Sequence, residues 1–220
     1  MIRALALALQ LLTRLPVSAA SQPPRPEELG LSVLCFPLVG LLIGALLAGL
    51  HTALWVIDPG VLAALVLSVW VLLTGGLHLD GLADTADAWI GGQGDRDRTL
   101  TIMKDPRSGP LAIIAIVLVL LNKFAALQML LAGDARVILL LTPVLGRTFI
   151  VLLLATTPYV RTDGLGTPYA RYLPRLSCGL LSLLVAAATV ALLEWHGAVM
   201  LAALAALFIV LRHWLMTRLG

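Results

Sequence analysis

The chain has 220 residues, of which 60% are hydrophobic and only 12% charged, and its mean hydropathy is +1.00. An ordinary soluble domain carries about 25% charged residues, so this composition excludes such a domain and indicates a membrane protein. The net charge of +3 is small. It could indicate an anionic partner, but we expect no nucleic-acid partner, and the positions of the charges are more informative than their sum.

Residues 2–16, at the start of the chain, predict an amphipathic helix that lies in the membrane interface. Arg3, Gln10 and Arg14 are spaced by seven and four residues, so they form one polar stripe on an otherwise apolar helix. A signal peptide with a cleavage site at VSAA is the less favoured alternative. The segment SQPPRPEELG at 21–30 then reads as a linker to the first span, so residues 1–30 precede the membrane domain proper.

Six apolar runs follow, each of a length that can cross a hydrocarbon core about 30 Å thick. Membrane strands would need about 10 alternating residues each, so these runs fit helices. The expected fold class is therefore all-α: a polytopic membrane helical bundle of about six transmembrane helices, in one integral membrane domain over residues 1–220. The expected spans are 31–57, 60–79, 110–132, 137–157, 176–193 and 197–213.

The Lys and Arg residues indicate how these spans are oriented. With the N-terminus inside, twelve of the fifteen fall on the cytoplasmic side and Arg136 on the other, while Lys123 and Arg147 lie inside spans. Because cytoplasmic loops carry the excess of positive residues, we expect an N-in and C-in protein of the bacterial or archaeal inner membrane. The two long loops, 80–109 and 158–175, then face the cytoplasm and are expected to carry the active site.

An acidic stripe, TGGLHLDGLADTADAW at 74–89, joins the second span to the first long loop. On a helix, Asp80, Asp84 and Asp87 share one face within about 60°. Adjacent carboxylates repel one another and stay ionised most readily around a cation, and an all-oxygen set suits Mg²⁺. A solvated acidic helix end is the alternative, but it explains only Asp80 through the helix dipole. The stripe therefore predicts a Mg²⁺ site.

Three residues just before Asp80 are further candidates. His78 could bind the metal or transfer a proton, or it could be an interfacial histidine whose ring is satisfied by neighbours. Gly75 and Gly76 would let the backbone approach a phosphate or a neighbouring helix closely. Alone, these glycines are weak evidence for a phosphate site.

The opposite charge comes from the stretch at 91–111. Arg98, Lys104 and Arg107 could clamp phosphate oxygens, because guanidinium groups offer forked donors and lysine a point charge. Asp105 could complete the metal shell. Positive-inside anchoring is the alternative for the basic residues, but the Pro and Gly turns of KDPRSG favour a shaped loop.

Two ionisable residues, Lys123 and Arg147, lie within predicted spans. Such groups are costly at membrane depth and usually face a bundle interior or a water-filled cavity. They imply a polar cavity that opens from the cytoplasm, where they would contact substrate, or a structural pair with one another. The stretch YVRTDGLG at 159–166 adds Arg161 and Asp163 as candidates for substrate contact.

With these motifs assembled, the chain resembles the cobalamin synthase family, the adenosylcobinamide-GDP ribazoletransferases of cobamide biosynthesis. The matching stretches, in the family's order, are LTRLPV (12–17), FPLVGLLIGA (36–45), TGGLHLDGLADTADAW (74–89), RDRTLTIMKDPRSG (96–109) and YVRTDGLG (159–166). The resemblance implies a Mg²⁺-dependent integral membrane transferase. It would join adenosylcobinamide-GDP to α-ribazole or its 5'-phosphate and release GMP, the late step that attaches the lower ligand of cobalamin.

The resemblance also implies roles for the candidates. Mg²⁺ on the aspartate stripe and Asp105 would offset the charge of the pyrophosphate and stabilise the departing GMP. Asp80, Asp84 or His78 would take the proton of the attacking hydroxyl, while the basic residues bind phosphates. The expected partners are the two substrates, the lipid bilayer and a second copy of the chain in a homo-oligomer.

One departure from the family concerns the end of the chain. Members usually continue past the last span into a segment of the type GGxTGDxxGA, whereas this chain stops at MTRLG. If that segment completes the site, the chain is expected to fold yet be weakly active or inactive.

The sequence favours the transferase over two other functions. A CDP-alcohol phosphotransferase would carry the form DxxDGxxAR, and DGLADTAD lacks the AR and the second aspartate pair. A transporter's polar groups would cluster near the midplane, whereas most charge here lies in loops.

Overall fold

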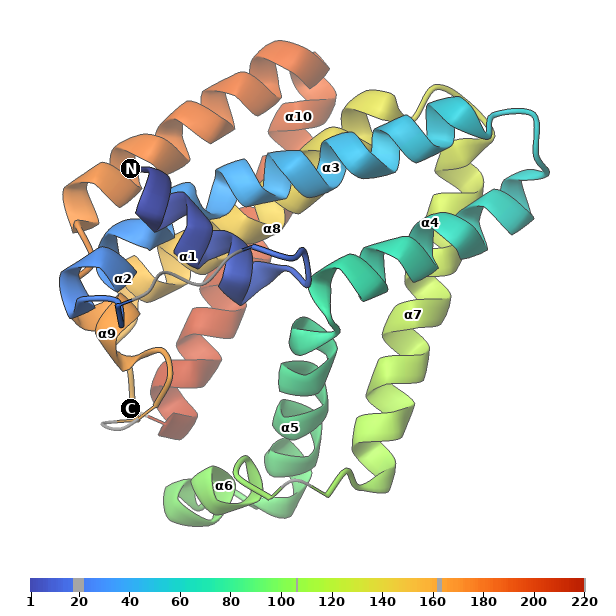
Figure 1. Cartoon of the computed structure of the whole chain (residues 1–220). Helices are drawn as coiled ribbons and strands as arrows, with labels where there is room; N and C mark the ends of the chain where they lie inside the picture. The colour runs from blue at the N-terminus through green and yellow to red at the C-terminus, as the bar shows by residue number, and fades with distance from the viewer. Residues whose placement is uncertain (18–21, 106, 162–163, 220) are drawn as a thin grey trace. The chain divides into compact units, whose positions relative to one another are not determined.

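The computed structural model describes residues 1–17, 22–105, 107–161 and 164–219, and every regular element within them is helical (Figure 1). This confirms the all-α expectation. The elements are α1 (Ile2–Leu12), α2 (Pro26–Ser32), the 3₁₀ helix η1 (Val33–Cys35), α3 (Phe36–Ala53), α4 (Pro59–Thr74), α5 (Leu77–Gly91), α6 (Arg96–Ile102), α7 (Pro110–Leu131), α8 (Arg136–Thr156), α9 (Thr167–Arg171) and α10 (Arg175–Leu219).

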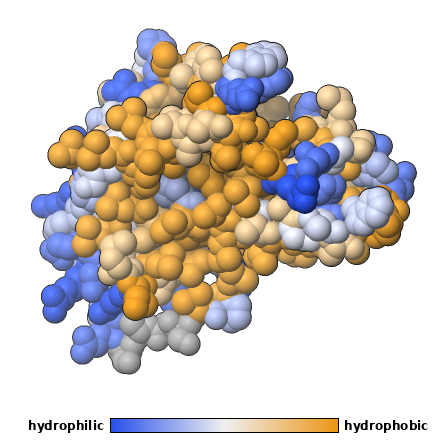
Figure 2. Space-filling view, turned by 90° about the horizontal axis from the view of Figure 1, so that it is seen from above, coloured by the Kyte–Doolittle hydropathy of each residue, from blue (hydrophilic) through white to orange (hydrophobic). Residues whose placement is uncertain are grey.

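Four helical stretches among the described residues are long and apolar enough to cross a membrane. They are Pro26–Ala53, Pro110–Leu131, Arg136–Thr156 and Arg175–Leu219, and the bent pair of α4 and α5 would make a fifth if it forms one span. Many large apolar side chains on them are exposed, including Leu183 at 68% and Ile114 at 53%, and Figure 2 shows a face on which hydrophobic side chains predominate. The chain is therefore an integral membrane protein by length and composition, and the count of six spans stays a prediction.

The second predicted span ends earlier than expected. The sequence predicted one run over 60–79, but α4 ends at Thr74 and α5 leaves it at 86°. Gly75 (φ 63°) and Gly76 (φ 70°) both take the left-handed conformation, which costs little only for glycine. The glycine pair thus turns the chain and sets where the acidic helix begins.

Chain contacts divide the described residues into two compact units. One comprises Met1–Gly49 and Arg136–Arg218, and the other comprises Leu50–Ala135 together with Leu219. The single domain over 1–220 stays a prediction.

In the first unit, α3 packs backbone to backbone on α8. A Cβ added at Gly40 would lie 2.5 Å from the carbonyl oxygen of Pro143, and one added at Gly44 would lie 2.5 Å from that of Leu140. These two glycines form a GxxxG pair, which lets membrane helices approach closely. Their lack of side chains therefore determines how near the two helices lie.

The long helix α10 is broken at Glu194, which has φ 52° and ψ −130°. A Cβ added at Gly197 would lie 2.6 Å from the carbonyl oxygen of Thr189, although residues eight apart on a straight helix are about 12 Å apart along its axis. The chain therefore folds back at Glu194, between the predicted spans 176–193 and 197–213. Near the end of the returning part, Arg212 donates from Nε and Nη2 to the carbonyl oxygen of Thr156 and caps α8.

The predicted interfacial helix, α1, is held to the rest of its unit through Arg3. Its guanidinium donates to the carbonyl oxygens of Gln22 and Pro23, and its Nε lies 3.4 Å from a carboxylate oxygen of Glu28. The apolar Ile2 is 89% exposed. Part of the polar stripe therefore serves packing within the protein, and the interfacial location of α1 stays a prediction.

Candidate functional site

The three aspartates of the acidic stripe lie on one helix, α5, as the sequence predicted. Asp80 stands in its first turn and is exposed, while Asp84 and Asp87 are half-buried. The spacing of four and three residues places them along one face. Asp80 is also where a carboxylate complements the helix dipole, so that alternative remains valid for this one residue.

Asp87 is engaged by the start of α7. Its Oδ2 accepts a hydrogen bond from the backbone N–H of Gly109 at 2.5 Å, and its Oδ1 accepts one from Ala112 at 3.0 Å. Gly109 is the N-cap residue of α7 and has no side chain to cap the helix itself. The capping carboxylate therefore comes from another helix, 22 residues earlier in the chain.

Asp105 is engaged by Arg107 in the loop that precedes α7. The guanidinium donates from Nε to Oδ1 at 3.0 Å and from Nη2 to Oδ2 at 2.8 Å, and the Arg107 backbone N–H also donates to Oδ1. These hydrogen bonds lower the pKa of Asp105 to about 2. Because the pKa is lowered, this pairing is fully present above the ordinary Asp range and is lost only as pH falls through about 2.

The remaining basic candidates of this loop lie on or beside α6. Asp95 caps that helix by accepting hydrogen bonds from the backbone N–H groups of Asp97 and Arg98, at 2.9 and 3.0 Å. The Thr99 side chain packs directly over Gly92, where a Cβ would collide with it, so α6 lies close against the end of α5. Arg98 and Lys104 are exposed, and so is Arg107. The predicted phosphate ligands thus lie on the surface of the second unit, which also contains the aspartates.

His78, one of the three candidate proton acceptors, and the glycine pair lie at or just before the start of α5. His78 is exposed, and its Nδ1 lies 3.5 Å from the hydroxyl of Thr74 at the end of α4. Gly75 and Gly76 form the turn between the two helices. The turn accounts for both glycines, and contact with substrate stays a prediction for all three residues.

The donor set for a metal can be compared with what Mg²⁺ requires. Among the residues that the structure describes, no three His, Cys, Asp or Glu side chains converge closely enough to hold an ion. Mg²⁺ needs only one or two carboxylates when waters and substrate phosphates complete its shell. Asp80 and Asp84 lie one turn apart on α5 and would supply such a pair of carboxylates.

The two ionisable residues within predicted spans have different surroundings. The Nζ of Lys123 lies 3.6 Å from the centroid of the Trp70 ring, which places a cation–π contact between α7 and α4. In the other unit, the Nε of Arg147 is buried and has no hydrogen-bond partner among the described residues. Lys123 thus has an aromatic partner within its own unit, and the choice between a polar cavity and a structural pair stays open.

In the second long loop, hydrogen bonds join the described residues near Tyr159. The Tyr159 hydroxyl accepts a hydrogen bond from the Gly166 backbone N–H at 3.2 Å, and Thr167 donates from its hydroxyl to the carbonyl oxygen of Arg161. Asp163 lies outside the described residues. A role for Arg161 in substrate contact stays a prediction.

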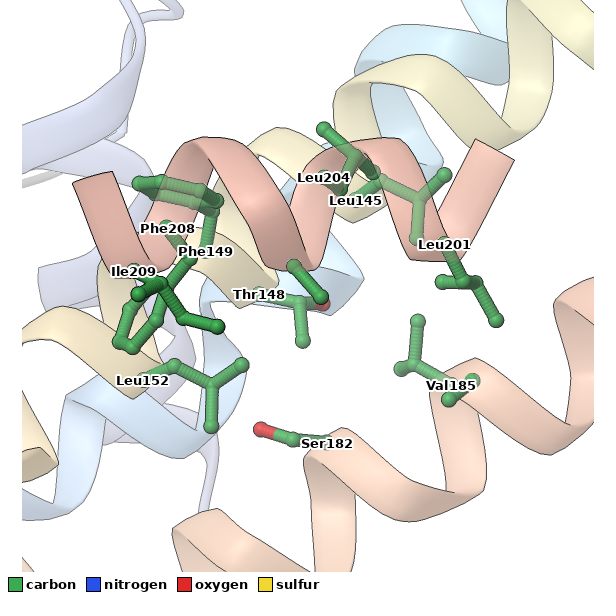
Figure 3. A pocket seen from close by; sticks show the side chains of 12 residues that line it. Leu145, Thr148, Phe149, Leu152, Ser182, Val185, Leu201, Leu204, Phe208 and Ile209 are labelled. Atoms are coloured by element: carbon green, nitrogen blue, oxygen red, sulfur yellow. The ribbon is translucent and has the colours of Figure 1, made fainter. Parts of the chain in front are cut away.

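An apolar pocket of about 310 Å³ lies between α8 and the two parts of α10 (Figure 3). Phe149 and Phe208 meet edge to face there, with ring centroids 5.2 Å apart. The hydroxyls of Thr148 and Ser182 donate to backbone carbonyls of their own helices. No predicted site residue lines this pocket, and sequence reasoning missed it because its lining is ordinary for membrane spans.

Comparison with known proteins gives a consistent result over nearly the whole chain. A family model described as cobalamin-5-phosphate synthase matches residues 4–220. The adenosylcobinamide-GDP ribazoletransferase of Pseudomonas syringae pv. syringae is 53% identical over 214 residues, which are 97% of this chain and 88% of the relative. The enzyme of the same name from Ectopseudomonas mendocina is 54% identical over 215 residues, 97% and 87% of the two chains. No solved structure matches.

Proposed function

Because this chain belongs to the cobalamin-5-phosphate synthase family, we propose that α5 and the basic loop after it carry out the family's transfer with the help of Mg²⁺. The chain is a transferase of cobalamin biosynthesis: it joins adenosylcobinamide-GDP to α-ribazole or its 5'-phosphate and releases GMP. The CDP-alcohol phosphotransferase and transporter readings are not favoured. The observation that carries the site proposal is the acidic helix, with Asp80 and Asp84 one turn apart, followed by three exposed basic residues in the same unit.

In this reaction a ribose hydroxyl attacks the corrinoid-side phosphorus of the pyrophosphate, and the bond from that phosphorus to the oxygen of the GMP phosphate breaks. A bound Mg²⁺ would supply positive charge at the phosphate oxygens. Asp80 and Asp84, one turn apart on α5, would hold it. The attacking hydroxyl must lose a proton, and Asp80, Asp84 or His78 would accept it.

The basic residues would orient the pyrophosphate by charge-assisted hydrogen bonds. Arg98, Lys104 and Arg107 are exposed and therefore open to a soluble phosphate. The carboxylate of Asp105 accepts two hydrogen bonds from the guanidinium of Arg107, and these bonds limit the rotamers that Arg107 can adopt. Because the Arg107 side chain is already restricted, it loses less conformational entropy when substrate binds.

Removal of divalent metal is expected to reduce GMP release to background, and added Mg²⁺ is expected to restore it. The reason is that a divalent ion held by two carboxylates would offset the charge of the pyrophosphate and of the departing GMP phosphate more effectively than a single basic side chain. The measurement is GMP release from adenosylcobinamide-GDP and α-ribazole by protein in liposomes, with EDTA and then excess Mg²⁺. Undiminished release in EDTA would contradict the use of a metal.

We further propose that the protein lies in the inner membrane with both ends and the aspartate helix on the cytoplasmic side. Twelve of fifteen Lys and Arg residues support this orientation. We expect Thr101→Cys, at an exposed position of α6 near the basic residues, to react with an impermeant maleimide only after the membrane is opened. Gly133→Cys is expected to react from outside. Cys35 and Cys178 are buried and should add little background, and the reverse labelling pattern would refute the orientation.

A further inference from the structure

We propose that Asp87 is a positioning residue rather than a metal ligand: it fastens the start of α7 to α5 and so fixes where the end of the basic loop lies relative to the acidic helix. This inference rests on the proposed function in one respect, that Asp80 and Asp84 hold the metal. The attachment itself is a feature of the fold and can be tested without activity.

Both carboxylate oxygens of Asp87 take part in the attachment. They accept the backbone N–H groups of the N-cap residue and of the third residue of α7, at 2.5 and 3.0 Å. These are among the donors that a helix leaves without a partner at its N-terminus. Ala112, the donor of the second bond, is fully buried, so water cannot readily replace the carboxylate there.

The absence of a side chain at Gly109 leaves room for the carboxylate of Asp87. A Cβ on Gly109 would lie 2.8 Å from Oδ1 of Asp87 and 3.0 Å from its Cγ and Oδ2. The backbone of Gly109, at φ −83° and ψ 175°, is accessible to any residue, so conformational freedom does not require glycine here. The requirement is space for the carboxylate of Asp87 over the start of the helix.

Electrostatics also favour Asp87 as the residue that caps α7, with Asp80 and Asp84 as the metal ligands. The N-terminus of α7, a helix of 22 residues, carries partial positive charge and already offsets the charge of Asp87. A divalent cation on Asp87 would lie beside that positive end and would compete with two N–H donors for the same oxygens. Asp84 and Asp80 stand about one and two turns earlier on α5, so a cation held by them would avoid this conflict.

The attachment bears on catalysis through Arg107. Its Cα is two residues from Gly109 and therefore within about 7 Å of it. Gly109 is bound to α5 through Asp87, and Arg107 is held by Asp105, so the guanidinium has a limited range relative to the acidic helix. Loss of the attachment should therefore weaken alignment of the pyrophosphate without removing a metal ligand.

Three variants separate this role from metal binding: Asp87→Ala, Asp87→Asn and Gly109→Ala. In protein without metal or substrate, we expect the amides at the start of α7 to exchange with deuterium about tenfold faster in Asp87→Ala and Gly109→Ala. Asp87→Asn keeps one acceptor oxygen and should give a smaller increase. Gly133→Ala, whose added Cβ would be 4.0 Å from its nearest neighbour, is the matched control and should exchange as wild type.

The kinetic measurement uses GMP release in liposomes as a function of Mg²⁺ and of adenosylcobinamide-GDP. Asp87→Asn and Gly109→Ala are expected to raise KM for adenosylcobinamide-GDP several-fold, with the Mg²⁺ concentration at half-maximal rate within about twofold of wild type. Asp84→Asn should instead raise that Mg²⁺ concentration about tenfold or more. The inference is overturned if Asp87→Asn shifts the Mg²⁺ requirement as Asp84→Asn does, or if Asp87→Ala leaves the exchange of α7 unchanged. If wild-type GMP release proves independent of Mg²⁺, the proposed metal use fails, while the exchange experiment still decides whether Asp87 fastens α7.

Discussion

Replacing Asp84 by Asn is expected to lower GMP release about 100-fold at a Mg²⁺ concentration that saturates the wild-type protein. The substitution keeps the size of the side chain and removes its negative charge. A metal that stabilises a leaving phosphate contributes several kcal/mol to the barrier, and each 1.36 kcal/mol corresponds to about a factor of ten in rate. The measurement is the initial rate of GMP release in liposomes, with Mg²⁺ varied.

Asp97→Asn is the matched control for this experiment. Asp97 lies on α6 in the same unit, its side chain is 92% exposed, and its ion pair with Arg96 is long at 3.8 Å. Such an exposed pair contributes little, so we expect a rate within about twofold of wild type. If Asp84→Asn retained nearly full activity in a folded protein, α5 would not be the metal-binding helix.

Adding a methyl group at Gly44 is expected to destabilise the first unit. The Cβ of Gly44→Ala would lie 2.5 Å from the carbonyl oxygen and 2.7 Å from the Cα of Leu140, and backbone atoms cannot move aside as a flexible side chain can. Overpacking of this kind costs about 1–3 kcal/mol, which corresponds to a drop in Tm of several degrees for a chain of this size. Thermal unfolding in detergent measures the change, and Gly40→Ala should behave similarly.

Gly49→Ala, on the same helix, distinguishes a clash from a general effect of replacing glycine. Nothing lies within 4 Å of the Cβ position at Gly49. Alanine is the better helix former, so this variant should be neutral or slightly more stable. Equal destabilisation by Gly44→Ala and Gly49→Ala would show that close contact between α3 and α8 is not the cause.

The sequence alone was sufficient to predict the fold class and the local geometry along single helices. Runs of about 20 apolar residues with few charges can satisfy their backbone in lipid only as helices, so the all-α membrane fold follows from composition and length. The helical period likewise placed Asp80, Asp84 and Asp87 on one face, because that relation depends on residues within two turns of each other. The motifs around them were specific enough to indicate the family that the chain matches from residue 4 to 220.

The tertiary structure decided which of these residues have other partners. Sequence spacing treated the three aspartates alike, but Asp87 accepts hydrogen bonds from the start of a helix 22 residues later, a relation that no local period encodes. It also placed Gly75 and Gly76 at the bend between α4 and α5, and it made Gly44 a contact point with α8. Local sequence pattern therefore determined which side chains could take part in chemistry here. Packing between distant segments decided which of them also stabilise the fold, because a hydrogen bond or a close approach depends on distance in space and not on separation in sequence.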